Sequence, residues 1–121
     1  MDSEENEGIS IIRKEERISF IDPKTLIIKQ LVSPAFASFD VEINFVTIPA
    51  GMTTGLVPPQ KNGRKEYLVL TKGSLQVKVG ENVCELKEGD SIYFEAHYEH
   101  EIVNPWPADA EFFLVDRKTV P

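Results

Sequence analysis

Short apolar segments alternate with turn residues along almost the whole chain, and no segment shows convincing helical periodicity. Residues 41–48 are representative, because Val41, Ile43 and Phe45 alternate with Glu42 and Asn44 at the period of two of a half-buried strand. The candidate strands span residues 9–12, 26–32, 41–48, 66–71, 74–79, 83–87, 91–94, 100–104 and 110–116. Eight or more strands separated by turns predict an all-β sandwich or barrel. A parallel sheet is not expected, since it would need crossover helices.

The length of 121 residues is typical of a single domain. Residues 1–8 are acidic and contain only one apolar residue, Met1, so we expect them to be disordered. Residues 9–121 then form the one domain. Within it, residues 66–71 are apolar on both faces, which predicts a central position in the sheet.

The charge and the cysteine content exclude several classes of function. The net charge is −7 and the basic residues are scattered, so we expect no direct contact of this domain with nucleic acid. A single cysteine, Cys84, cannot form an internal disulfide, which fits a cytoplasmic protein. The acidic N-terminus does not resemble a secretory signal, and no apolar run approaches the roughly 20 residues of a membrane helix.

Both histidines of the chain lie in one stretch, "GDSIYFEAHYEHEIVNP" at residues 89–105. His97 and His100 are three residues apart, and on a strand this odd spacing points two side chains to opposite faces. His97 falls in the loop before the strand, so its direction is open. It either joins His100 in holding a metal ion or is a partly exposed loop histidine.

This stretch resembles the second motif of the cupin family, G-x5-P-x-G-x2-H-x3-N. Gly89 takes the first position, His100 the histidine position and Asn104 the asparagine position, while Glu95 and His97 replace Pro and Gly. The resemblance implies a double-stranded β-helix, the cupin form of the jelly-roll barrel.

The first cupin motif, G-x5-H-x-H-x3,4-E-x6-G, is matched only in part. Glu66 and Gly73 take its last two positions, but Gln60 and Asn62 stand near the two histidine positions. The order of segments from about residue 9 to residue 115 is similar to the C-terminal sensor cupin of Xre-type helix-turn-helix regulators. That resemblance implies a regulatory cupin domain that is part of, or partner to, a transcriptional regulator.

Metal-bearing cupins hold Fe, Mn, Ni or Zn with three histidines and one glutamate, and only Glu66 and His100 remain of that set here. We therefore expect no metal cofactor and no catalytic residues. The predicted ligand-binding residues are Gln60, Asn62, Glu66 and His100, the partner is a small-molecule effector, and the chain is expected to be a homodimer. The alternative is a metal-dependent dioxygenase or isomerase with Glu66 and His100 as ligands and His97 or Gln60 recruited as a third.

Strand parity predicts which neighbours share the inward face with Glu66 and His100, namely Leu68, Leu70 and Ile102. The pocket would be absent if Tyr93, Tyr98 or Trp106 filled the barrel mouth. The basic run "KNGRK" at residues 61–65 has two interpretations. It is a solvated loop, or it contacts an anion beside the pocket. Cys84 is expected to pack as a small hydrophobe, and one of Phe112 and Phe113 to enter the core.

Overall fold

The computed structural model describes residues 4–6, 8–35, 40–60 and 63–118. Its strands are β1 (Glu4–Asn6), β2 (Ile9–Ile11), β3 (Ser19–Ile21), β4 (Ile28–Leu31), β5 (Val41–Ile48), β6 (Lys65–Lys72), β7 (Ser74–Val79), β8 (Asn82–Lys87), β9 (Ser91–Glu95), β10 (His100–Val103) and β11 (Ala110–Arg117). A single turn of 3-10 helix, η1 (Lys14–Glu16), precedes β3. Among the described residues, no helix is long and apolar enough to cross a membrane.

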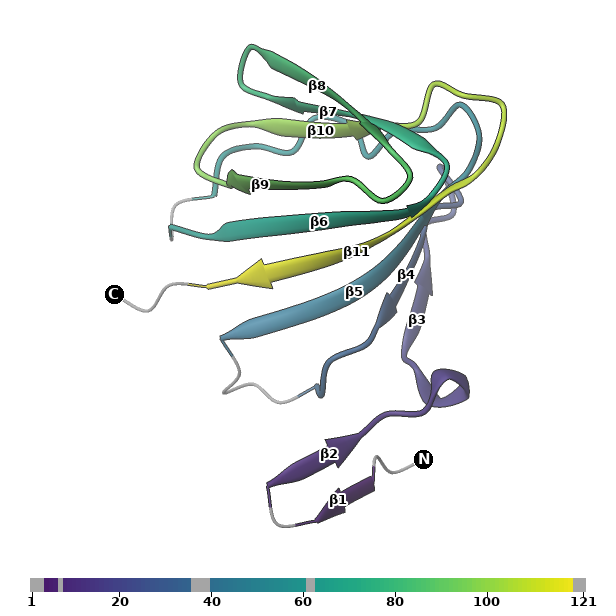
Figure 1. Ribbon diagram of the computed structural model, residues 1–121, viewed down its shortest axis with the longest axis vertical. Helices are drawn as coiled ribbons and strands as arrows, with labels where there is room; N and C mark the ends of the chain where they lie inside the picture. Colours follow the sequence, from purple (N-terminus) through teal and green to yellow (C-terminus); the bar gives the residue numbers. More distant parts are fainter. Residues whose placement is uncertain (1–3, 7, 36–39, 61–62, 119–121) are drawn as a thin grey trace.

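Two antiparallel sheets form the body of the molecule (Figure 1). The larger sheet has the strand order β3-β4-β5-β11-β6-β9, and the smaller has the order β10-β7-β8. Strands β1 and β2 pair with each other alone and lie beyond the β3 side of the larger sheet (Figure 1). The all-β prediction is confirmed.

The core lies between the two sheets because every second residue of each strand points inward. Its fully buried side chains include Ile48, Leu68, Leu70, Leu75, Val77 and Phe112. The parity prediction is confirmed, since Leu68, Leu70 and Ile102 are all buried. Phe112 enters the core, whereas the next residue, Phe113, packs in a tilted arrangement against Phe45 outside it, with 4.9 Å between the ring centroids.

The predicted strands 41–48 and 74–79 coincide with β5 and β7, and the other seven correspond to β2, β4, β6, β8, β9, β10 and β11 with shifted ends. Strands β1 and β3 were not predicted. Strand β6 is flanked by β11 and β9, but its outer face is not buried, because Tyr67 and Val69 are 41% and 40% exposed. The division into residues 1–8 and 9–121 stays a prediction, and the structure pairs Glu4–Asn6 with β2.

The buried Asn104 has a structural role. Its side-chain amide donates to the carbonyls of Ile48 and Ala108 at 3.0 and 2.8 Å, and its Oδ1 accepts from the backbone N–H of Trp106 at 3.1 Å. These bonds fasten the loop after β10 to the end of β5, so the motif asparagine stabilises the barrel rather than facing a ligand.

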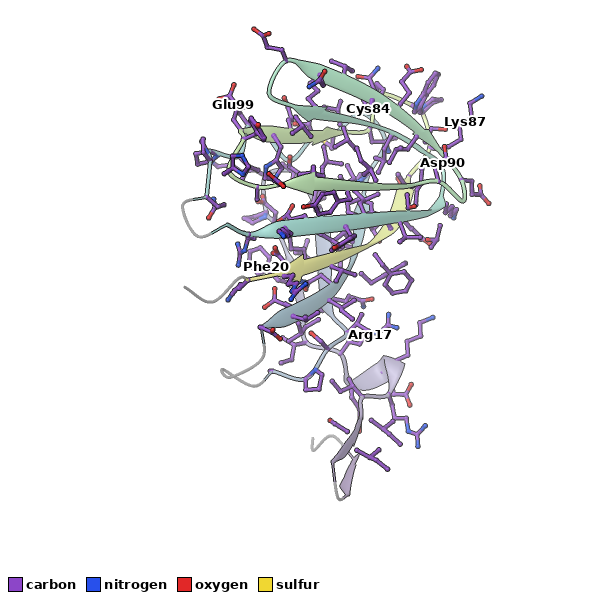
Figure 2. The ribbon with its side chains drawn as sticks, turned by 60° about the vertical axis from the view of Figure 1, so that its left-hand side comes forward. Arg17, Phe20, Cys84, Lys87, Asp90 and Glu99 are labelled. Carbon is purple, nitrogen blue, oxygen red and sulfur yellow. The ribbon has the colours of Figure 1, made fainter. Side chains whose placement is uncertain are left out.

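The two ends of the barrel differ. Lys87 and Asp90 lie together at one end, where the Asp90 carboxylate accepts from the Lys87 backbone N–H at 2.8 Å, and Glu99 lies at the other end (Figure 2). His100 at the start of β10, Glu66 near the start of β6 and Asp116 near the end of β11 share this second end, because β11 runs antiparallel to β6.

Candidate functional site

A cavity of about 370 Å³ opens at the end of the barrel that carries Glu66 and His100. Its floor is apolar, with Val46, Ile102, Phe112 and Leu114 supplied by strands β5, β10 and β11. Its mouth carries polar side chains. A concave apolar space with a few convergent polar groups is the usual form of a small-molecule site.

Glu66 and His100 face each other in this cavity and are both buried. His100 Nε2 lies 3.6 Å from Glu66 Oε1, which is longer than a hydrogen bond. The backbone of His100 is fixed by two hydrogen bonds to Val57, of 2.7 and 3.1 Å, and its ring packs on Phe94. Burial lowers the pKa of His100, so its imidazole is held neutral.

Glu66 also has a carboxylate neighbour. It lies directly opposite Asp116 in the pairing of β6 with β11. Burial, and then the negative charge of Asp116, raise the pKa of Glu66 to about 7, against the opposing charges of Arg64 and Lys29. Two adjacent buried carboxyl groups cannot both ionise cheaply, so Glu66 is only partly ionised near neutral pH.

Arg64 provides the counter-charge of Asp116. Its Nε lies 3.1 Å from Asp116 Oδ1, and both side chains are largely buried. That carboxylate oxygen has no well-aligned hydrogen bond, so the contact is an ion pair with poor hydrogen-bond geometry. Arg64 and Lys29 both line the cavity.

The structure brings together three of the four predicted ligand-binding residues, since Gln60, Glu66 and His100 all line the cavity. The fourth, Asn62, lies outside the described residues, as does Lys61. His97 is not part of the lining. Its side chain is 47% exposed, its Nδ1 lies 3.4 Å from Glu95 Oε1, and its ring stacks on Tyr98. The mouth is not filled by Tyr93, Tyr98 or Trp106, which are all exposed.

Several cavity residues were not predicted from the sequence, and the charged ones among them are Asp22, Lys29, Glu42 and Asp116. Asp116 could have been found, because it has the same strand parity as Phe112 and Leu114 and therefore points inward with them. Arg64 belongs to the basic run at residues 61–65, whose solvated-loop interpretation is wrong for Arg64. The sequence around Lys29 does not indicate that it lines a cavity. Lys29 reaches the cavity because β4 pairs with β5 in the sheet.

The donor set does not fit a transition metal. Among the described residues, no group of three or more His, Cys, Asp or Glu side chains is arranged to hold an ion. Asp116 could supply a third ligand beside Glu66 and His100, but it is already paired with the Arg64 guanidinium at 3.1 Å. A neighbouring cation opposes the entry of a metal ion.

Comparison with protein families finds one match, to the model described as "Cupin domain", over residues 44–116. Comparison with curated proteins finds no significant match.

Several solved structures share the fold. One is the cupin domain of an XRE-family transcriptional regulator from Enterobacter cloacae, with a TM-score of 0.71 and 15% identity over 78% of this chain and 98% of that chain. Another is an HTH_3-family transcriptional regulator from Vibrio cholerae, with a TM-score of 0.73 and 22% identity over 81% of this chain; the match spans 55% of the Vibrio chain. A third is a predicted oxalate decarboxylase from Thermotoga maritima, with a TM-score of 0.73 and 21% identity over 90% and 99% of the two chains. At these identities the likeness shows the double-stranded β-helix fold.

Proposed function

The chain belongs to the cupin domain family, and we propose that it is a small-molecule-binding module whose cavity takes its ligand without a metal ion. One observation carries the proposal: the cavity combines an apolar floor with the buried polar groups of Glu66, His100 and Asp116. Buried polar groups orient a ligand by hydrogen bonding, and the apolar floor supplies the area that stabilises the complex.

We further propose that the module is cytoplasmic and regulatory, and that it passes the ligand signal to a DNA-binding domain attached to it or paired with it. Two of the structures with this fold are transcriptional regulators or domains of them, which supports the proposal. A sensor needs only a difference in ligand affinity between two conformations, and this requires no bond-breaking step.

Filling the cavity tests the binding function. Leu114→Phe adds volume to the cavity lining, whereas Val115→Phe adds the same type of side chain to the other face of β11. We expect Leu114→Phe to weaken ligand binding roughly tenfold or more, because overpacking costs about 1–3 kcal/mol. Val115→Phe should bind as the parent does. The measurement is mass spectrometry of small molecules released from the purified protein, with calorimetric titration of those recovered.

The alternative is a metal-dependent cupin enzyme with Glu66 and His100 as ligands. Elemental analysis of untagged protein, purified without chelators, separates the two hypotheses. We expect a bound metal content far below one ion per chain. Near-stoichiometric metal that disappears in His100→Ala would contradict the metal-free proposal, and His97 and Gln60 would be the next ligands to test.

The partner of the chain is proposed to be a second copy. The outer face of the larger sheet carries the tilted aromatic pairs Phe45–Phe113 and Tyr67–Tyr93, with the exposed Val69 between them in the sheet. Charges of both signs lie at each end of this face, since Lys65 is opposite Glu95 at one end and Glu111 is opposite Lys72 at the other. Two such faces related by a two-fold axis would bury these aromatic pairs against one another.

Introducing a charge on this face tests the dimer. We expect Val69→Glu to produce a monomer, because pairing would bury the new carboxylate. Val83→Glu places the same charge on the exposed β8 of the smaller sheet and should leave the dimer intact. The measurement is sedimentation equilibrium. A parent monomer, or equal behaviour of the two variants, would contradict the proposed interface.

A further inference from the structure

Two cationic side chains at the cavity have unused hydrogen-bond donors. Arg64 contacts Asp116 through Nε alone, and its two terminal nitrogens make no hydrogen bond to the described residues. Lys29, from β4, has no hydrogen-bond or ion-pair partner within the part of the chain that the structure describes. A guanidinium edge and an ammonium group facing one cavity form a donor set suited to an anion.

Two acidic side chains of the lining, Asp22 and Glu42, already accept hydrogen bonds from neighbouring groups. Asp22 Oδ1 accepts from the backbone N–H groups of Lys24 and Thr25 at 2.8 and 3.2 Å, and Glu42 Oε2 accepts from the Asn44 amide at 3.0 Å. One carboxylate oxygen of each of these two acids is therefore already hydrogen-bonded.

The two buried acids are neighbours, and one of them has a cationic partner. Asp116 is paired with Arg64, and Glu66 lies directly opposite Asp116. Since burial and Asp116 raise the pKa of Glu66 to about 7, Glu66 is only partly ionised near neutral pH. The donors of the cavity that remain free of a hydrogen bond to the described residues include the terminal nitrogens of Arg64 and the ammonium of Lys29.

We propose that the ligand is a small organic acid, whose carboxylate binds between the Arg64 guanidinium and the Lys29 ammonium. Its carbon skeleton would lie on the apolar floor formed by Val46, Phe112 and Leu114. This assignment rests on the proposed binding function and adds the chemical class of the ligand. Bidentate pairing with a carboxylate suits the planar edge of Arg64, and the ammonium of Lys29 adds a second charge.

Three probes of matched size test the class of ligand, namely pentanoate, pentylammonium and pentanol. Each is titrated calorimetrically into the full chain at neutral pH and low ionic strength. We expect pentanoate to bind at least tenfold more tightly than the other two. Arg64→Gln and Lys29→Gln should each weaken pentanoate binding by roughly tenfold or more, because each removes a charge-assisted interaction.

Lys24→Gln is the matched control, because Lys24 is exposed in the turn beside the cavity but does not line it. This variant should bind pentanoate as the parent does. If Arg64→Gln does not fold, Lys29→Gln decides the result, since Lys29 is exposed and has no partner among the described residues.

The outcomes separate the ligand class from the binding function. Tighter binding of pentylammonium, or pentanoate binding that survives both substitutions, overturns the organic-acid assignment. A recovered natural ligand that is neutral or cationic and that Leu114→Phe excludes overturns only this assignment and leaves the binding function standing. If no probe binds and no ligand is recovered, both the organic-acid assignment and the proposed binding function are overturned.

Discussion

Glu66→Gln is expected to stabilise the protein at pH 8 by roughly 3 kcal/mol relative to the parent. The pKa of Glu66 is raised from 4.5 to about 7 in the fold, so the folded state holds a proton that the unfolded state releases. The parent therefore loses stability as the pH rises from 4.5 through 7, and the loss is complete above 7. Glutamine is close in shape and cannot ionise, so the variant avoids this loss.

Urea unfolding at pH 5, 6, 7 and 8 measures the effect. The difference between variant and parent should be small at pH 5 and largest at pH 8. His100, whose pKa is lowered by burial, reduces stability as the pH falls below 6.5, but this contribution is common to both proteins and cancels in the difference. Glu85→Gln, on the exposed face of β8, is the control and should show no such difference. A Glu66→Gln protein less stable than the parent at pH 8 would mean that the fold requires an ionised Glu66.

Gly73→Ala is expected to destabilise the protein by about 2 kcal/mol more than Gly89→Ala. Both glycines have positive φ angles, of 86° and 93°, so both substitutions incur the strain of a side chain in that region. At Gly73, a Cβ would also lie 2.8 Å from the backbone oxygen of Asp109 and 3.1 Å from the Cα of Ala110. At Gly89, nothing lies within 4 Å of that position.

Denaturant unfolding of the two variants separates the cost of the strained φ angle, which both variants share, from the cost of the steric clash with Asp109 and Ala110, which only Gly73→Ala has. Since the neighbours of Gly73 are backbone atoms at the start of β11, they cannot rotate away as a flexible side chain would. Equal losses for the two variants would mean that this backbone moves at little cost. In that case Gly73 would be required only for its φ angle.

The sequence predicts those parts of the fold that depend on local pattern. Strand β5 was placed correctly because Val41, Ile43 and Phe45 alternate with polar residues up to Pro49, and β7 because Leu75 and Val77 alternate up to Gly80. Strand β3 was missed because its three residues are all exposed and show no alternation. Its pairing with β4 is what makes it a strand.

The residues of the candidate site also fall into those that local sequence predicts and those that depend on long-range strand pairing. Glu66 and His100 were identified because they match motif positions within short segments. Arg64 and Asp116 meet only because β11 aligns Asp116 with Glu66, and this register between strands distant in the sequence cannot be read from either segment. Lys29 reaches the cavity because β4 pairs with β5, again a long-range choice.

The residues that line the cavity come partly from the segment that matches the family model and partly from the segment before it. The match to the family model begins at residue 44, and it includes Glu66, His100 and Asp116. One side of the cavity is instead formed by the hairpin of β3 and β4, which carries Phe20, Asp22 and Lys29 and precedes that match. Among the described residues of this hairpin, only Ile27 belongs to the buried hydrophobic core. Substitutions in this one hairpin would therefore reshape one wall of the cavity, while leaving most of the core of the barrel unchanged.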